Sequence, residues 1–270
     1  MKGLTGYRAY RAHARAAALS ALAYRGSFLL ALGGVAFQLI ALLAVWRVLL
    51  GNGDAGSIGG FDWPHMRSYL LVAFATGALV GGFVDFRMSH RIRSGLVSLD
   101  LVKPVDYQRA RLWECIGGVW IEAVVIVAVA GLAVLFTGPP QLPAAPEFGL
   151  FAVSMVALVP LKFVVSYLTT LACFWTENFV GVLWARQALT GLLSGALVPL
   201  AFFPGWLATA AQWSPFAGLT STPALIFVGQ ATGRHALLLV AAQLGWLTLL
   251  WFAARALFDR ALRRLTVHGG

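Results

Sequence analysis

Five histidines and two cysteines are the residues of this 270-residue chain best suited to bind metals or act as nucleophiles. The histidines are scattered along the chain, so their spacing assembles no metal site, and Cys115 and Cys173 stand alone inside apolar stretches. The sequence has no His-Glu-x-x-His helix, no Gly-x-Ser-x-Gly turn and no Gly-x-x-x-x-Gly-Lys-Ser/Thr phosphate loop. We therefore expect no catalytic residue, no metal ion and no cofactor in this chain.

Two ionisable residues, Glu122 and Lys162, lie deep inside apolar stretches. Glu122 is nine residues past Trp113, which is about 13 Å along a helix and close to the middle of a membrane. A charge at that depth is costly and indicates a specific role. Two interpretations stay open. Either the residues neutralise each other across neighbouring helices, or they line a polar cavity on a substrate pathway.

The elements that carry these charges are predicted to be transmembrane helices. The chain is 60% hydrophobic and 11% charged, whereas water-soluble domains carry about 25% charged residues. A membrane span needs about 20 mainly apolar residues. The segments that meet this requirement are 28–50, 69–86, 113–136, 148–173, 179–203 and 235–258. The predicted fold class is all-α: a polytopic membrane protein with six transmembrane helices.

The basic residues outside these spans are distributed unevenly. Fourteen Lys and Arg lie in 1–27, 87–112 and 259–270, against two in 51–68 and 204–234. Because cytoplasmic loops carry the excess of Lys and Arg, both termini and the 87–112 loop are predicted to face the cytoplasm.

The N-terminal segment 1–25 is predicted to be an amphipathic helix on the membrane surface. Arg8, Arg11 and Arg15 recur at three- and four-residue steps among apolar residues. Its basic face is explained either by solvent and anionic lipid or by a mechanical role.

The external segment 204–234 is interrupted by three prolines and carries Trp206 and Trp213. It is too interrupted to span a membrane, and tryptophan favours the interface. We predict a pair of short helices that dip into the outer leaflet, with an ordinary external loop as the alternative.

The cytoplasmic loop 87–112 carries an apolar stripe on a basic background. Ile92, Leu96 and Leu99 are spaced by four and three residues, which predicts a short helix that Pro104 ends. The stripe either docks on a partner or packs on the inner ends of the spans.

The whole pattern resembles the permease subunit of type-2 ABC exporters, and the resemblance covers nearly the whole chain. More narrowly, Ile92-Arg-Ser-Gly95 followed by Leu99-Asp-Leu-Val-Lys-Pro104 is similar to the cytoplasmic loop of the viologen-exporter-like branch. The run Pro199-Leu-Ala-Phe-Phe-Pro204-Gly-Trp-Leu, with Trp213-Ser-Pro215-Phe, is similar to the external segment of the family.

The resemblance implies that the cytoplasmic loop is a coupling helix received by a separate ABC ATPase subunit, and that residues 1–25 form a connecting helix. The residues that it assigns to this contact, with Arg91 nearer the rim, are Arg91, Ile92, Ser94, Gly95, Leu96 and Leu99.

The resemblance also implies an assembly of two permeases, the same or homologous chains, with two ATPases that bind ATP and Mg. Residues 1–270 would then form a single transmembrane domain without a nucleotide-binding domain. The assembly would expel a substrate by alternating access. A drug-like, cationic or amphipathic substrate suits Glu122, although Lys162 argues against a simple anionic trap.

Two other classes of function stay open. A channel or scaffold subunit without an ATPase explains the spans but leaves the basic loop without a partner. A lipid-modifying enzyme requires convergent acids or histidines, and the best cluster, Asp100, Asp106 and Glu114, is diluted by basic neighbours. No nucleic-acid partner is expected, because a net charge of +10 in a membrane chain belongs at the cytoplasmic lipid surface.

Overall fold

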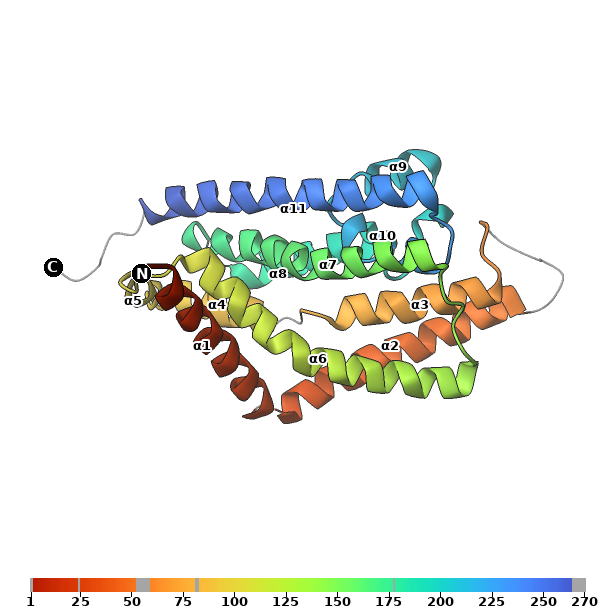
Figure 1. The fold of residues 1–270 in the computed structure, drawn as a ribbon, viewed down its shortest axis with the longest axis horizontal. Helices are drawn as coiled ribbons and strands as arrows, with labels where there is room; N and C mark the ends of the chain where they lie inside the picture. The colour runs from red at the N-terminus through yellow and green to blue at the C-terminus, as the bar shows by residue number, and fades with distance from the viewer. Residues whose placement is uncertain (1, 24, 52–58, 81–82, 177, 264–270) are drawn as a thin grey trace.

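The computed structural model describes residues 2–23, 25–51, 59–80, 83–176 and 178–263, and the elements in this part of the chain are helices (Figure 1). The predicted all-α class is confirmed. The longer helices are α1 (Lys2–Ala23), α2 (Arg25–Gly51), α3 (Trp63–Ala78), α4 (Phe83–Arg93), α6 (Tyr107–Thr137), α7 (Ala145–Leu171), α8 (Phe179–Leu193) and α11 (Gly233–Leu262). The shorter elements are α5 (Val97–Leu101), α9 (Gly205–Gln212), α10 (Ser221–Phe227) and the 3₁₀ turns η1 (Ala172–Phe174), η2 (Leu200–Phe202) and η3 (Ala217–Leu219).

Side-chain caps set the start of several helices. Asp62, Asp106 and Asn178 each accept a hydrogen bond from the backbone N–H three residues later, at 2.8–3.1 Å. Each bond satisfies a donor that the first helical turn would leave without a partner. These caps fix the first turns of α3, α6 and α8.

The described helices that are long and apolar enough to cross a membrane by themselves are Tyr107–Thr137, Ala145–Phe174 and Gly233–Leu262. Two further apolar helices, Ala36–Leu50 and Phe179–Leu193, are shorter. The structure therefore supports a membrane protein, but the predicted count of six spans is not confirmed.

The predicted continuous span 69–86 is wrong. α3 ends at Ala78 and α4 begins at Phe83. Between them Val80 has φ +56°, a left-handed conformation that non-glycine residues rarely adopt. The chain thus crosses this region as two helices, and the backbone groups at the break need other partners.

The predicted span 179–203 is also too long, because α8 ends at Leu193. Gly195 follows with φ +77°, and a Cβ there would lie 2.7 Å from the hydroxyl oxygen of Tyr69. That hydroxyl donates a hydrogen bond to the Gly195 carbonyl at 2.8 Å. The close approach of α3 requires glycine at this turn, and the chain continues as loop and η2 instead of helix.

α7 is the central helix of the bundle, lying between α11 and the pair α3 and α6 (Figure 1). Its inner residues are fully buried: Leu158, Leu161, Phe163, Val164, Tyr167 and Leu171. α6 is peripheral and leaves large apolar side chains exposed, among them Trp120, Val124, Val127 and Leu135. Such a surface can pack against lipid or a second membrane subunit, since the membrane interior contains no water and the exposed apolar side chains carry no hydration cost there.

The 204–234 segment folds partly into the bundle. Gln243 of α11 is 2% exposed, accepts a hydrogen bond from the Ser154 hydroxyl at 2.7 Å and donates one to the carbonyl of Gly218 at 2.8 Å. All three groups are buried, and the Gln243 amide provides a hydrogen-bond partner for both the Ser154 hydroxyl and the Gly218 carbonyl. This network ties η3 to α7 and α11.

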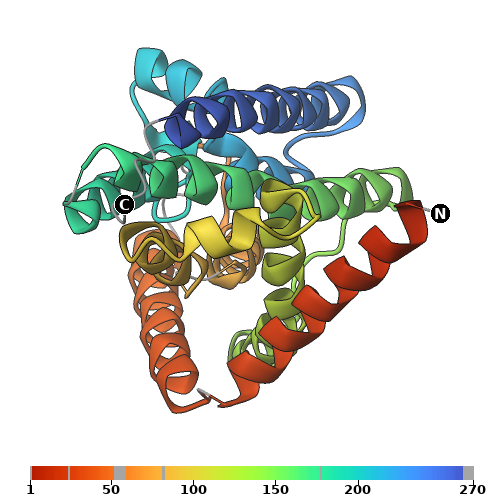
Figure 2. The ribbon, with the colours of Figure 1, turned by 90° about the vertical axis from the view of Figure 1, so that its left-hand side faces the viewer.

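α1 lies across α6 at close range (Figure 2). A Cβ on Gly117 of α6 would overlap the carbonyl oxygen of Ala14 on α1, so only glycine permits this crossing. Around it, His13 contacts Glu114 at 3.0 Å, and the rings of Tyr10 and Trp113 stack with centroids 6.4 Å apart.

Gly117→Ala is therefore expected to push α1 away from α6. Overpacking costs about 1–3 kcal/mol, so detachment of α1 should become about 5- to 150-fold easier. The measurement is the rate of tryptic cleavage at Arg11 and Arg15 in the purified protein. Gly118→Ala is the matched control, since no atom lies within 4 Å of its Cβ position. Equal cleavage of the two variants would contradict the crossing.

Candidate functional site

The cytoplasmic loop of the sequence forms an elbow, residues 91–103, at the end of the bundle that also holds the start of α1 and the end of α11 (Figure 1). Gly95 has φ +73° and donates its N–H to the carbonyl of Ile92 at 3.1 Å, which turns the chain between α4 and α5. The predicted single short helix is wrong, because it is two helices joined at this glycine.

Asp100 holds the elbow in shape. Its side chain is 2% exposed and accepts two hydrogen bonds from Arg91, both at 2.8 Å, and one from Lys103 at 2.8 Å. Burial raises the pKa of the Asp100 carboxyl, but these bonds lower it by more, so its pKa lies below the usual value and the group is ionised at neutral pH. The two-bond fork from Arg91 also fixes the relative orientation of α4 and α5.

Arg91, which was expected nearer the rim of the contact, binds Asp100 through its guanidinium, and its side chain is 35% exposed. Ile92 is misassigned to the exposed stripe, because it is 6% exposed and packs inward. The cause is the turn at Gly95, which separates α4 from α5, so the spacing of a single helix does not apply.

The remaining predicted residues lie on the outside. Leu96 and Leu99 are 39% and 62% exposed, and Ser94 is exposed as well. Val102, which the sequence pattern did not include, is 83% exposed. Leu96, Leu99 and Val102 are spaced by three residues along the elbow, and together they are called the apolar tip. Exposed apolar clusters on otherwise charged surfaces mark contact sites.

Lys162 of α7 contacts the break between α3 and α4. Its ammonium group donates to three backbone carbonyls at the end of α3: Thr76 at 2.7 Å, Gly77 at 3.0 Å and Leu79 at 2.5 Å. A positive charge also complements the negative end of the helix dipole. Lys162 therefore acts as a C-terminal cap for α3.

Glu122 of α6 also contacts this break, where its carboxylate accepts a hydrogen bond from the N–H of Val80 at 2.7 Å. Neither interpretation drawn from the sequence included this role. The two charges satisfy backbone groups that a broken helix leaves open inside a membrane bundle. The sequence feature that could have indicated a break in this helix was the pair Gly81-Gly82 in the shortest predicted span.

A second buried charge pair was missed by sequence reasoning. Arg186 of α8 contacts Asp85 of α4 at 2.6 Å, with side chains 16% and 4% exposed. The sequence carried a signal for this pair, because Asp85 lies inside the predicted span 69–86 and Arg186 inside the predicted span 179–203. The pair attaches the first turn of α4 to α8, immediately after the break.

No group of three or more metal-binding side chains occurs within the part of the chain that the structure describes. The cluster considered for an enzyme is also dispersed over structural contacts. Asp100 is bound in the elbow, Asp106 caps α6, and Glu114 is paired with Arg111 at 2.8 Å.

Comparison with known proteins gives one family match. No curated protein matches the chain. The family model described as ABC-2 family transporter protein matches residues 36–269, which includes α3 to α11, the elbow and the break. Members of this family form the membrane component of ABC transporters and are not themselves catalytic. With apolar membrane helices and a match over most of its length, the chain belongs to the ABC-2 transporter family and is a permease subunit of an ABC transporter.

Proposed function

We propose that this permease belongs to an ATP-driven exporter of the viologen-exporter-like branch, and that its elbow is the coupling element received by a separate ABC ATPase subunit. The observation that carries the proposal is the apolar tip of Leu96, Leu99 and Val102 on the elbow that Asp100 holds rigid. A rigid tip transmits a push, whereas a flexible loop would absorb it.

ATP and Mg, bound by the paired ATPases, would close them and displace the elbows. Through α4, each elbow continues to the break and to the pair of Asp85 and Arg186. The displacement would rock two permeases, of the same or homologous chains, from inward-open to outward-open. α1 would act as the connecting helix beside the elbow.

A drug-like substrate with cationic or amphipathic character fits this proposal. An apolar pocket of about 500 Å³ lies between α2, α3 and α6, with Leu39, Leu43 and Phe136 among its walls. It suits the apolar part of such a molecule. ATP-dependent accumulation of an amphipathic cationic dye in inside-out vesicles would support this substrate class, and accumulation without ATP would exclude an exporter.

The proposed orientation has both termini and the elbow in the cytoplasm. It is supported by the fourteen-to-two distribution of basic residues and by the common end of α1, α5 and α11. In a Cys115→Ala/Cys173→Ala background, an impermeant thiol reagent added outside cells should label Thr209→Cys and spare Ser98→Cys, both at exposed positions. External labelling at position 98 would overturn the orientation.

Co-expression with the cognate ATPase subunit tests the function. Purification through a tag on the permease should recover the ATPase in a fixed ratio, and substrate should stimulate ATP hydrolysis. A channel or scaffold subunit would be purified without an ATPase, and that outcome would overturn the proposal.

A further inference from the structure

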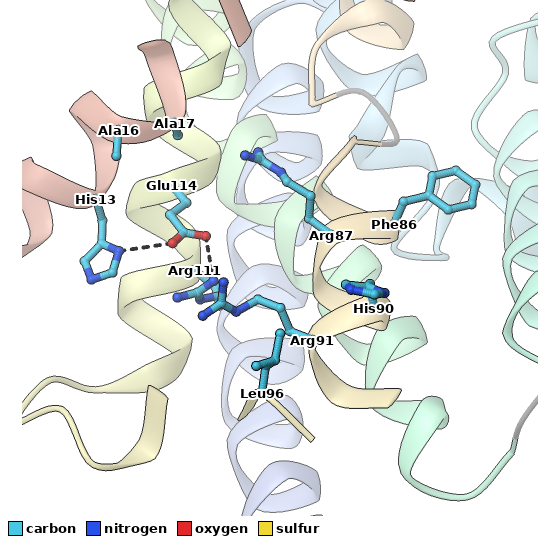
Figure 3. Close-up of a pocket in the computed structure, with 10 residues that line it drawn as sticks. All are labelled: His13, Ala16, Ala17, Phe86, Arg87, His90, Arg91, Leu96, Arg111 and Glu114. Atoms are coloured by element: carbon cyan, nitrogen blue, oxygen red, sulfur yellow. Dashed lines mark hydrogen bonds and ion pairs between the residues drawn. The ribbon is translucent and has the colours of Figure 1, made fainter. Parts of the chain in front are cut away.

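A pocket of about 450 Å³ lies between α1, α4 and α6 beside the elbow (Figure 3). Of the three residues of the apolar tip, Leu96 also lines this pocket, so the two surfaces adjoin each other. Basic groups dominate its ionisable lining, which consists of His13, Arg87, His90, Arg91, Arg111 and Glu114.

The charges around this pocket do not balance. Two carboxylates, Glu114 in the wall and Asp100 behind it, face four permanent cations, Arg87, Arg91, Lys103 and Arg111. Asp100 binds Arg91 and Lys103, and Glu114 binds Arg111 and His13. Within the described part of the chain, Arg87 has no ion pair and its side chain is exposed at the pocket. The pocket therefore holds an excess of positive charge.

Arg111 provides a second observation that points to a ligand. Its side chain is only 6% exposed, yet its Nε has no hydrogen-bond partner in the protein. A buried donor without a partner is costly. Because this Nε is itself shielded from solvent, an anion in the pocket would offset the cost through the charge of the guanidinium and not through a bond to Nε. Figure 3 shows the guanidinium groups of Arg111 and Arg91 close together beside Glu114.

With α6 centred in a membrane, the pocket would straddle the boundary between the lipid headgroups and the hydrocarbon core. α6 has 31 residues, which is about 46 Å of helix, so it exceeds a hydrocarbon core of about 30 Å by roughly 8 Å at each end. Arg111 and Glu114 are four and seven residues past its first residue, or about 6 and 10 Å. The neighbouring stack of Tyr10 on Trp113 is typical of this interfacial layer.

We propose that this pocket binds the phosphate group of an anionic phospholipid. Basic pockets between membrane helices at the cytoplasmic side recognise such headgroups. Phe86, 56% exposed in the pocket wall, offers an apolar contact for the attached acyl chain. Because its walls come from α1, α4 and α6, the bound lipid would join the surface helix to the helix that carries the elbow. The proposal concerns the permease alone and does not depend on ATPase docking.

The test is lipid retention by the purified full-length permease, measured by native mass spectrometry during titration with phosphatidylglycerol or phosphatidylcholine. Phosphatidylglycerol should bind at least tenfold more tightly. Arg87→Gln should weaken its binding about fivefold, which corresponds to about 1 kcal/mol per basic contact. Arg93→Gln is the matched control, because Arg93 is exposed on the same helix but does not line the pocket.

Equal binding of the two lipids, or equal loss in the two arginine variants, would overturn the proposal, because it would indicate general attraction to a basic surface. Competition between glycerol phosphate and phosphatidylglycerol tests whether the ligand is a soluble phosphate ester instead of a lipid. Failure to displace phosphatidylglycerol assigns the site to lipid, whereas displacement at equal concentration means that a soluble phosphate ester fills the pocket and overturns the lipid assignment. Arg87 has no partner that its removal would leave buried, so the variant should fold.

Discussion

Lys162→Met is expected to prevent this chain from forming a stable, monodisperse protein. The substitution leaves three carbonyls at the end of α3 without their common donor inside the bundle. It also removes the positive charge that opposes Glu122 near the same break. Loss of one partner of a buried charge costs about 3–5 kcal/mol, and unsatisfied backbone groups in a membrane add to that cost. Size-exclusion profile and thermal unfolding of the detergent-purified protein measure the effect.

Glu122→Gln should be much milder, because an amide oxygen still accepts a hydrogen bond from the N–H of Val80. The double variant Lys162→Met/Glu122→Gln should remain unstable, since the carbonyls of α3 still lack a donor. Simple neutralisation of one charge by the other predicts the opposite, recovery in the double variant. Val156→Met, at a 76% exposed position on the same helix, controls for the introduced methionine. Normal stability of Lys162→Met would show that the cap is dispensable.

Leu99→Asp is expected to abolish recovery of the ATPase while leaving the permease folded. Leu99 is 62% exposed, so a carboxylate there is solvated in the free permease. In the proposed contact the same carboxylate would be buried without a partner, at a cost of about 2–4 kcal/mol. Affinity for the ATPase should then fall about 30- to 1,000-fold. Co-purification and substrate-stimulated ATP hydrolysis measure this loss.

Leu99→Met is the matched control and should bind the ATPase normally, because it keeps an apolar side chain of similar size. Leu99 is a cleaner test than Leu96, which also lines the basic pocket beside Arg91 and Arg111. A carboxylate at position 96 would therefore change two sites at once. Normal ATPase recovery with Leu99→Asp would remove the elbow from the contact and leave the lipid proposal intact.

The elbow illustrates which part of a site the sequence could predict. Leu96 and Leu99 were identified from their spacing on a basic background, and both are exposed. Ile92 was misassigned, because a helical pattern assumes one axis and the chain turns at Gly95. The partner of Arg91 is Asp100, nine residues away across the turn. Periodicity within one helix does not report such a pair.

The sequence by itself determined that this chain is an all-helical membrane protein, because long apolar runs can be covered only by lipid or by other apolar helices. It also identified Glu122 and Lys162 as unusual, because a charge in an apolar run is costly wherever the run folds. Only the tertiary structure decided what those charges do. The end of α3 and the N–H of Val80 obtain their hydrogen-bond partners from α7 and α6, more than 40 residues away. Local sequence sets the cost of breaking a helix, but only long-range packing supplies the groups that offset it.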